Sequence, residues 1–472
     1  MTVRPLPERS LEDLLLAWLP RQRWFAGKDR PVDEVAVASG TVLRDGDPGL
    51  RHLVLDVRQG AAVDRYQLLA GIRRDPPERL RQGGIGAVPG GFAYDAAHDP
   101  ELTGTLLAAM AAGAVHGPLR FHRAEGASID TGLTGKPATG EQSNTSLVYG
   151  QDYICKLFRR LAPGVSPDLE VNLALTGRGS PHVPPVLGWF ELDRGDGSPP
   201  DTLGLMSRFL HTATDGWRLA VTSVRDWFAQ PVAPRSARTG AGLDAGGAGG
   251  DFAGEAERLG AATAEVHRDL AAAFGVTEVG GAELRALAAG MHGQLAEVAA
   301  SVPELKPHEA AIGTAFDALA RLDGPLPFQR VHGDYHLGQV LRSESGWVLL
   351  DFEGEPARTP EERAAPGHAL RDVAGMLRSF EYAARFLHAD EQHAPPGTAR
   401  ELELRARAWA GRNRRAFCRG YAAAGGADPD AHAALLRALE LDKAVYEIRY
   451  EAANRPSWLP VPLRSLAGPD AG

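Results

Sequence analysis

The chain has 472 residues, enough for two lobes plus a further module, and its 60 acidic and 51 basic side chains give a net charge of −9. This balance, without a long run of either sign, argues against a nucleic-acid partner or a polybasic membrane surface. Two cysteines outside any CxxC motif and the absence of a run of about 18 apolar residues predict a reduced, cytoplasmic protein without a disulfide framework, zinc site or membrane anchor.

Residues 1–93 are expected to form an N-terminal module. Ser10 followed by two acids is typical of a helix start, and Pro20 is expected to end that helix. The adjacent Trp24 and Phe25 are interpreted as core packing. Alternating or apolar runs then predict strands of a small sheet at 35–43, 52–57 and 63–69.

A phosphate-binding loop is expected in the next segment, 94–210. The loop 140–146 joins two strand-like runs, and it can offer backbone N–H groups and short hydroxyls to phosphate oxygens. It lacks the G-x-G-x-x-G pattern, so a simple polar turn remains an alternative. The candidate ATP-binding residues are Gln142, Ser143, Asn144, Thr145 and Ser146.

Lys156 is the one charge in the apolar strand 153–158, where it shares a face with Ile154 and Phe158. A lysine that points inward needs an anion, and in a kinase the anion is the triphosphate, with a glutamate from the next helix holding the lysine. Glu170, in the first turn of a helix that starts at Ser166, is the candidate partner. A solvent-exposed edge-strand lysine with an unrelated glutamate is the alternative.

A hairpin is predicted from the runs 184–191 and 203–210, and its end is expected to be the hinge that holds adenine. Met206 and Arg208 mark this location. After about residue 211 the composition becomes helical, which predicts a C-terminal lobe over 211–472. The Gly/Ala-rich segment 233–251 cannot bury a core and is given no catalytic role.

The chemistry concentrates in the stretch 327–356. Asp334 and Gln339 lie five positions apart on a short loop, and Asp351 follows the apolar strand 347–350. Phosphoryl transfer needs groups that orient the attacking hydroxyl and hold Mg²⁺ through oxygen ligands. We therefore expect Asp334 to act on the hydroxyl, and Gln339 and Asp351 to bind the metal. Alone, each acid could simply cap a turn or end a strand.

Two later helices complete the predicted site. Arg371 and Asp372 are expected to lock the catalytic loop through charge-assisted hydrogen bonds. Tyr446, Glu447 and Tyr450 share one face of the last long helix, where rings and a carboxylate can bind a sugar. The alternative is that these tyrosines only pack the lobe.

The segments His332-Gly333-Asp334-Tyr335-His336-Leu337-Gly338-Gln339 and Asp351-Phe352-Glu353-Gly354-Glu355-Pro356 resemble the aminoglycoside phosphotransferase branch of kinase-like enzymes, and within it the maltokinases. Segments 142–146 and 443–460 and the N-terminal module are also similar to maltokinases. The resemblance implies an α+β, bilobal kinase-like fold with an N-terminal cap and a largely helical C-lobe. It also implies ATP and Mg²⁺ as cofactors, maltose as acceptor with His336 among its contacts, and maltose 1-phosphate as the product for α-glucan synthesis. It suggests association with a trehalose/maltose-interconverting enzyme.

Two other functions remain open at this point. One is a kinase for another sugar or an aminoglycoside, which an acidic pocket wall would favour. The other is a non-catalytic kinase-like protein that binds sugar, which the presence of Lys156, Asp334, Gln339 and Asp351 argues against.

Overall fold

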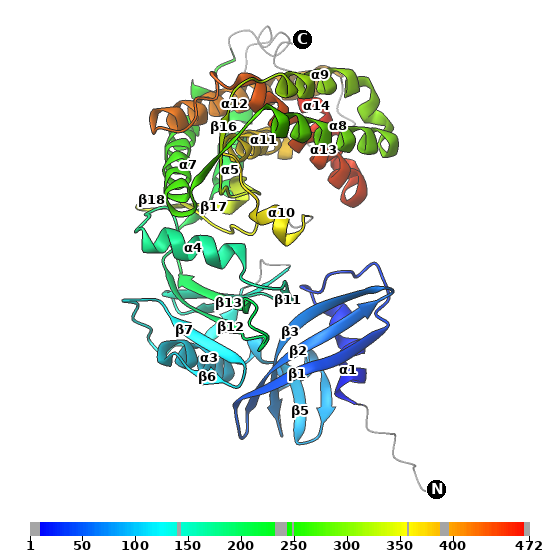
Figure 1. Ribbon diagram of the computed structural model, residues 1–472, viewed down its shortest axis with the longest axis vertical. Helices are drawn as coiled ribbons and strands as arrows, with labels where there is room; N and C mark the ends of the chain where they lie inside the picture. Colours follow the sequence, from blue (N-terminus) through cyan, green and yellow to red (C-terminus); the bar gives the residue numbers. More distant parts are fainter. Residues whose placement is uncertain are drawn as a thin grey trace. The chain divides into compact units, whose positions relative to one another are not determined.

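The structure of the protein is a computed structural model that describes residues 10–138, 143–231, 243–247, 250–355, 358–387 and 396–466 (Figure 1). The chain forms two compact units. Unit 1 comprises Met1–Leu173 and Pro184–His211, and unit 2 comprises Ala174–Val183 and Thr212–Gly472. Within the described ranges, none of the helices combines the length and the apolar character that crossing a membrane requires.

The first part of unit 1 is an antiparallel cap sheet preceded by one helix. The helix α1 (Leu11–Trp18) starts as the sequence predicts, because the Ser10 side chain and Asp13 form a reciprocal capping box. It packs on the sheet with Leu15, Trp18 and Trp24 in one apolar cluster. The strand order is β1-β2-β3-β5-β4, with α2 (Glu78–Gln82) before β4. The strands are β1 (Glu34–Arg44), β2 (Gly49–Gln59), β3 (Ala62–Arg73), β4 (Gly86–Val88) and β5 (Gly91–Asp95).

The second part of unit 1 is a seven-stranded sheet in the order β6-β7-β12-β13-β10-β9-β8. Its helix α3 (Pro100–Ala112) begins at an Asp99 cap with proline in the first turn, and it ends at Gly113, which has φ 61°. The helix α4 (Pro167–Gly177) follows β11 (Arg160–Leu161), which pairs with β3 of the cap sheet. The strands are β6 (Val115–His116), β7 (Leu119–Arg123), β8 (Gly135–Pro137), β9 (Thr145–Tyr149), β10 (Tyr153–Leu157), β12 (Val186–Leu192) and β13 (Asp201–Arg208).

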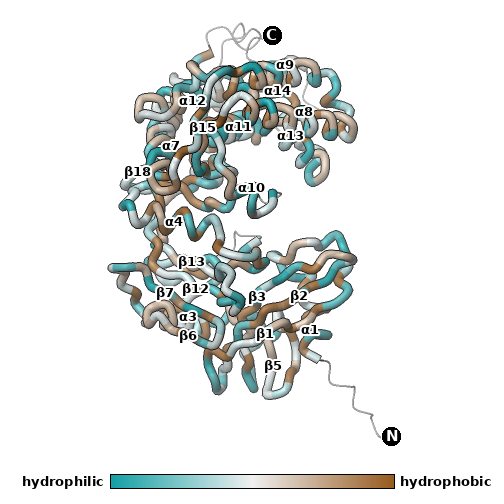
Figure 2. Tube along the Cα trace, viewed as in Figure 1, coloured by the Kyte–Doolittle hydropathy of each residue, from teal (hydrophilic) through white to brown (hydrophobic). Residues whose placement is uncertain are grey.

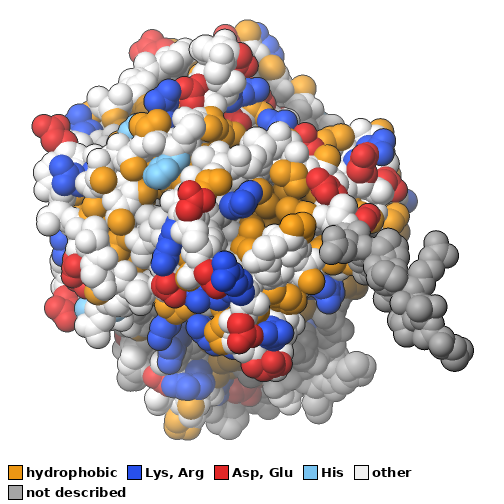
Figure 3. All heavy atoms as spheres, turned by 90° about the horizontal axis from the view of Figure 1, so that it is seen from below, with side chains coloured by type: hydrophobic (Ala, Val, Ile, Leu, Met, Phe, Trp, Pro, Cys, Tyr) orange, Lys and Arg blue, Asp and Glu red, His pale blue; other side chains and the backbone are white. Residues whose placement is uncertain are grey.

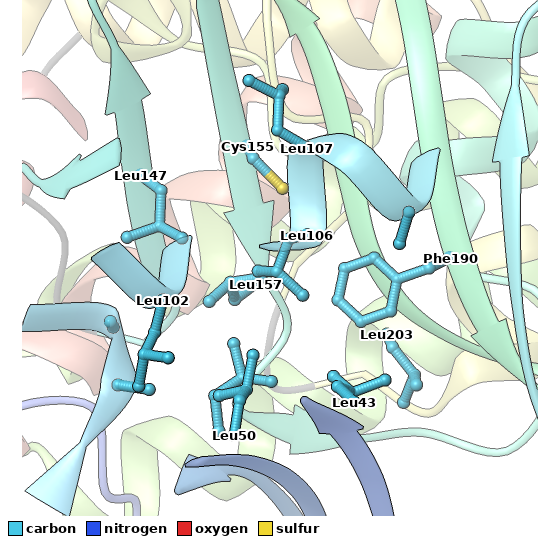
Figure 4. Close-up of a cluster of buried hydrophobic side chains, with 14 of the residues drawn as sticks. Leu43, Leu50, Leu102, Leu106, Leu107, Leu147, Cys155, Leu157, Phe190 and Leu203 are labelled. Atoms are coloured by element: carbon cyan, nitrogen blue, oxygen red, sulfur yellow. The ribbon is translucent and has the colours of Figure 1, made fainter. Parts of the chain in front are cut away.

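One apolar core joins the two sheets of unit 1. Leu43 and Leu50 of the cap strands lie in the same buried cluster as Leu106 of α3 and Leu157 and Phe190 of the second sheet (Figure 4). Figure 2 shows apolar residues recurring along β2 and β3, the strands that supply this core. The division at residue 93 stays a prediction, and the shared core makes both parts one compact unit.

Unit 2 is mainly helical and contains two small sheets. The sheets have the orders β14-β17-β18 and β15-β16-β19. The strands are β14 (Thr214–Asp215), β15 (Val276–Val279), β16 (Leu326–Gln329), β17 (Val340–Ser343), β18 (Gly346–Leu349) and β19 (Gly367–His368). The helices are α5 (Gly216–Phe228), α7 (Ala253–Phe274), α8 (Gly281–Ser301), α9 (Glu309–Ala320), α10 (Pro360–Ala364), α11 (Leu370–Phe386), α12 (Pro396–Ala423), α13 (Ala433–Asn454) and α14 (Pro460–Leu466).

Most predicted elements are confirmed. The capped helix at Ser10, the three cap strands and the hairpin β12–β13 are all present, and the chain after residue 211 is mainly helical. The fold is an α+β kinase-like fold with an N-terminal cap and a helical C-terminal region, as predicted. Most of the Gly/Ala-rich segment 233–251 lies outside the described residues. On the face drawn in Figure 3, acidic and basic side chains are interspersed.

Candidate active site

Lys156 in unit 1 is held by a buried carboxylate. It lies on β10, and its Nζ is 3.1 Å from Oδ2 of Asp168, in the first turn of α4. Asp168 is 3% exposed and also accepts a bond of 2.9 Å from Asn172. The expectation that Lys156 points inward to an acid from the next helix is therefore met by Asp168, which the sequence analysis did not single out. Glu170 is exposed on the same helix, and its role stays a prediction.

The predicted phosphate loop is partly a strand. Gln142 lies outside the described residues, whereas Ser143 and Asn144 precede β9. Thr145 and Ser146 belong to β9 and are buried, so the prediction of a loop through residue 146 was too long. The hydroxyl of Thr145 accepts a 2.8 Å bond from Nε of Arg159. Ser143 and Asn144 are therefore the described residues most open to a phosphate group.

The two residues named for the hinge, Met206 and Arg208, both belong to β13. Met206 is fully buried in β13, which pairs with β12 on one side and β10 on the other. A residue in such a strand uses its backbone groups within the sheet, so Met206 is a poor contact for adenine. Arg208 ends the strand, is exposed, and donates its N–H to the carbonyl of Pro185 over 3.1 Å.

Asp372 of α11 holds the backbone of residues 332–339 in unit 2, the segment predicted to be catalytic and here called the catalytic loop. Its two carboxylate oxygens accept the N–H groups of His332 at 2.7 Å and Gly333 at 2.9 Å, and His267 lies 2.9 Å from Oδ2. Burial opposes ionisation of this carboxyl, but the bond to His267 and nearby positive charge outweigh it and lower the pKa of Asp372. The predicted locking role of Asp372 is confirmed, whereas Arg371 reaches Glu355 instead, over 3.4 Å.

Gln339 and Asp351 lie side by side. Gln339 ends a short 3₁₀ turn, Leu337–Gln339, and its Nε2 donates to Oδ2 of Asp351 over 3.0 Å. Asp351 follows β18 and has φ 64°, the one positive φ of a residue other than glycine in the described ranges. Such a conformation is typical of functional sites. The carboxylate and the amide oxygen are both hard donors, so this donor set fits Mg²⁺.

Asp334 belongs to a charge network that crosses unit 2. Lys443 on α13 places Nζ 3.1 Å from Oδ1 of Asp334 and 2.7 Å from Oε1 of Glu355. Arg358 lies 2.7 Å and Arg371 3.4 Å from the other oxygen of Glu355. Burial opposes ionisation of Glu355, but Lys443 and the arginines outweigh it and hold its pKa at about 2. Burial likewise opposes the charge on Lys443, but the two carboxylates raise the pKa of this lysine.

The predicted acceptor residues line one pocket of about 410 Å³ in unit 2. His336 comes from the catalytic loop, and burial lowers the pKa of its imidazole. The α13 residues Tyr446, Glu447 and Tyr450 form one wall, next to Lys443. The structure thus brings the four predicted sugar-binding residues into one pocket, which Lys443, the residue that contacts Asp334, also lines.

The two carboxylates of this wall are paired with arginines. Glu447 accepts a 2.9 Å bond from the buried Arg378 of α11. Glu451 lies 2.6 Å from Arg455. The sequence analysis missed Lys443 as a partner of Asp334, as well as Arg378. The signal for Lys443 was its position three and four residues before Tyr446 and Glu447, on the same helix face.

The chain matches two families. Residues 18–99 match the maltokinase N-terminal cap domain, and residues 134–435 match the phosphotransferase enzyme family. A glucosamine kinase from Streptacidiphilus jiangxiensis is 32% identical over 351 residues, covering 70% of this chain and 73% of that protein. A glucosamine kinase from Mycolicibacterium smegmatis is 31% identical over 338 residues, covering 70% and 78%.

The structural comparison agrees. A glucosamine kinase in complex with glucosamine, ADP and inorganic phosphate aligns with a TM-score of 0.65 at 25% identity, over 97% of this chain and 99% of that one. A second crystal form of a glucosamine kinase gives a TM-score of 0.67 at 26% identity, over the same shares of the two chains.

The kinase-like fold, the match to the phosphotransferase enzyme family and the glucosamine kinase relatives define a phosphotransferase that acts on an alcohol group. The chain belongs to the phosphotransferase enzyme family and is similar to sugar kinases, which implies the use of ATP.

Proposed function

We propose that this enzyme transfers a phosphoryl group from Mg²⁺-ATP to the reducing-end hydroxyl of maltose, giving ADP and maltose 1-phosphate. The observation that carries the proposal is the pocket of about 410 Å³ that begins at Lys443, the partner of Asp334, and continues along an aromatic wall. Aromatic rings bind the apolar faces of ligands while a few polar groups set their orientation.

Under this proposal each predicted residue has one role. Asp334 accepts the proton of the attacking hydroxyl and orients its oxygen. Gln339 and Asp351 hold Mg²⁺, which neutralises charge on the triphosphate. Lys156, kept in place by Asp168, and the N–H groups near Ser143 bind phosphate oxygens.

The charges of the pocket favour a neutral acceptor. Glu447 and Glu451 are the two carboxylates of its wall, and each is already paired with an arginine. Lys443 adds a cation at the inner end. A positively charged sugar would find no excess of negative charge there, whereas the rings of Tyr446 and Tyr450 suit an uncharged glucoside. The match of residues 18–99 to the maltokinase N-terminal cap domain supports the same acceptor.

Glucosamine is the second candidate, and the names of the two relatives favour it. Its amino group would need a carboxylate that can bind a second cation besides the arginine with which it is already paired. Glu447 and Glu451 are the carboxylates of the pocket wall that could supply it. On either acceptor the transfer would use the same Asp334, Gln339 and Asp351.

The test is ADP release from Mg²⁺-ATP with maltose, glucose, glucosamine, trehalose and kanamycin offered in parallel. Release with maltose and production of maltose 1-phosphate are expected. Release with glucosamine and not with maltose would mean that glucosamine is the acceptor, and the assignment as a kinase would stand. Asp334→Asn is the control: it should bind ATP as the parent enzyme does while kcat falls steeply. Full activity in that variant would remove Asp334 from its role. A place for the product in α-glucan synthesis and an association with a trehalose/maltose-interconverting enzyme remain predictions.

A further inference from the structure

The acceptor pocket is elongated, because two helices line it along their length. On α11, Gly375, Ser379, Tyr382 and Phe386 follow one another at three- and four-residue spacing and all line the pocket. On α13 the lining residues have the same spacing: they are Lys443, Tyr446, Glu447, Tyr450 and Glu451. Residues at this spacing share a helix face. The two helices pack against each other, so the pocket follows both of them.

Both helices approach the loop that carries Asp334, α11 at Gly375 and α13 at Lys443. A Cβ at Gly375 would lie 2.6 Å from the carbonyl oxygen of Tyr335, the residue after Asp334, and Lys443 contacts Asp334 itself. The eleven residues from Gly375 to Phe386 advance about 17 Å along the helix axis at 1.5 Å per residue. The far end of the pocket is therefore more than one pyranose ring away from the reacting hydroxyl.

That far end is an aromatic cluster formed by Trp217, Phe386 and Trp458, here called the outer cluster. The ring of Phe386 lies 5.3 Å from that of Trp217 and 5.5 Å from that of Trp458, between centroids. Arg455 lies over Trp458 at 5.0 Å. The three rings come from α5, α11 and the turn after α13, and all of them line the pocket.

Phe386 is 37% exposed, although most of the other residues of α11 are buried. Leaving an aromatic ring in water forgoes the free energy of burying it. Rings that line a pocket and remain open to solvent are suited to a ligand with an apolar face and polar edges. A glucosyl ring has this character, since its C–H groups form faces and its hydroxyls form the rim.

We propose that the outer cluster is the subsite for the second sugar ring of the acceptor, the one that does not react, and that it selects a disaccharide over a monosaccharide. This inference rests on the proposed function. It deepens that function by assigning the preference for a disaccharide acceptor to residues outside the catalytic loop. Phe386 ends α11 away from Asp334 and Trp458 packs against it, so we expect these two rings to act on binding of the acceptor and not on transfer of the phosphoryl group.

The experiment compares Phe386→Ala and Trp458→Ala with a matched control, Leu387→Ala. Leu387 follows Phe386, is also 37% exposed and does not line the pocket. Steady-state rates are measured with maltose and with glucose at saturating Mg²⁺-ATP. We expect KM for maltose to rise about tenfold in both aromatic variants, with kcat nearly unchanged, because uniform binding is lost. Leu387→Ala should behave as the parent enzyme, and rates with glucose should not respond to any of the three changes.

The outcomes separate this inference from the function on which it rests. If the parent enzyme phosphorylates maltose and the aromatic variants match Leu387→Ala, the subsite is overturned and the proposed function stands. If glucose or glucosamine is used as efficiently as maltose, no second ring is selected and the subsite is overturned as well. If no sugar is phosphorylated, the proposed function is overturned, and the subsite that rests on it is overturned with it. Phe386→Leu, which keeps an apolar side chain, serves as a second variant and should show the same rise in KM.

Discussion

Lys443 places one cation between two carboxylates, Asp334 at 3.1 Å and Glu355 at 2.7 Å. Charge-assisted hydrogen bonds of this kind fix a side chain more firmly than neutral ones. We expect Lys443→Met to leave Asp334 free to turn away from the acceptor, and a small displacement of a catalytic group can cost about 10²-fold in rate. The measurement is kcat for the sugar acceptor, which should fall by about that factor while KM for ATP changes little.

Lys306→Met is the control for this prediction, because Lys306 is an exposed lysine in the turn before α9. Lys443→Arg should recover part of the rate, since it keeps the charge but not the geometry of the ammonium group. An unchanged kcat in Lys443→Met, with only KM for the sugar increased, would mean that Lys443 binds the acceptor and does not position Asp334.

The reacting residues could be predicted from the sequence, but their partners could not. Asp334, Gln339 and Asp351 stand within 18 positions of one another, so spacing alone suggests their joint use. Lys443 is 109 residues from Asp334, and no local pattern joins the two. For Lys156 the sequence analysis named Glu170, although Asp168 lies in the same first turn of α4. The orientation of α4 decides between them, because it turns Asp168 inward and leaves Glu170 exposed.

At the scale of elements, the contact between α7 and α12 depends on two glycines. A Cβ at Gly420 would lie 1.9 Å from the carbonyl oxygen of Glu257, and one at Gly260 would lie 2.1 Å from that of Phe417. These distances are far below van der Waals contact and involve backbone, which cannot move out of the way as a side chain can. We expect Gly420→Ala to separate the helices and to lower the free energy of unfolding by about 2 kcal/mol.

Gly290→Ala is the matched control, because Gly290 lies within α8 with no atom near the position of its Cβ. Alanine is the better helix former, so this change should raise the free energy of unfolding by about 0.5–1 kcal/mol. Both values come from urea unfolding followed by circular dichroism. If Gly420→Ala were as stable as Gly290→Ala, the close approach of α7 and α12 would not be required for stability.

The sequence predicted where each helix or strand begins and ends better than it predicted which elements pack or pair with one another. Local patterns located α1 from its Ser10 cap, and β1, β2 and β3 from their apolar runs. They could not show that Arg160 and Leu161 pair with β3, because strand partners are set by contacts between residues about 95 positions apart. For the same reason the sequence did not show that Met206, one of the residues named for the hinge, is paired with strands on both sides.

At the scale of the whole molecule, the cofactor prediction concerns stability as well as rate. A ligand that binds only the folded protein stabilises it by about 2.7 kcal/mol at a concentration 100 times its Kd. If Gln339 and Asp351 hold Mg²⁺, then ATP should raise the unfolding temperature more in the presence of Mg²⁺ than in the presence of EDTA. Thermal unfolding with and without each ligand measures this difference directly.

Asp351→Asn is the variant that tests the metal assignment. Asp351 has φ 64°, which asparagine adopts more readily than alanine, so this substitution removes the charge without adding backbone strain. We expect the Mg²⁺-dependent part of the ATP shift to disappear in Asp351→Asn and to persist in Asp334→Asn, since Asp334 is assigned to the hydroxyl and not to the metal. A full Mg²⁺-dependent shift in Asp351→Asn would contradict the assignment. Loss of the shift in Asp334→Asn alone would exchange the roles of the two acids.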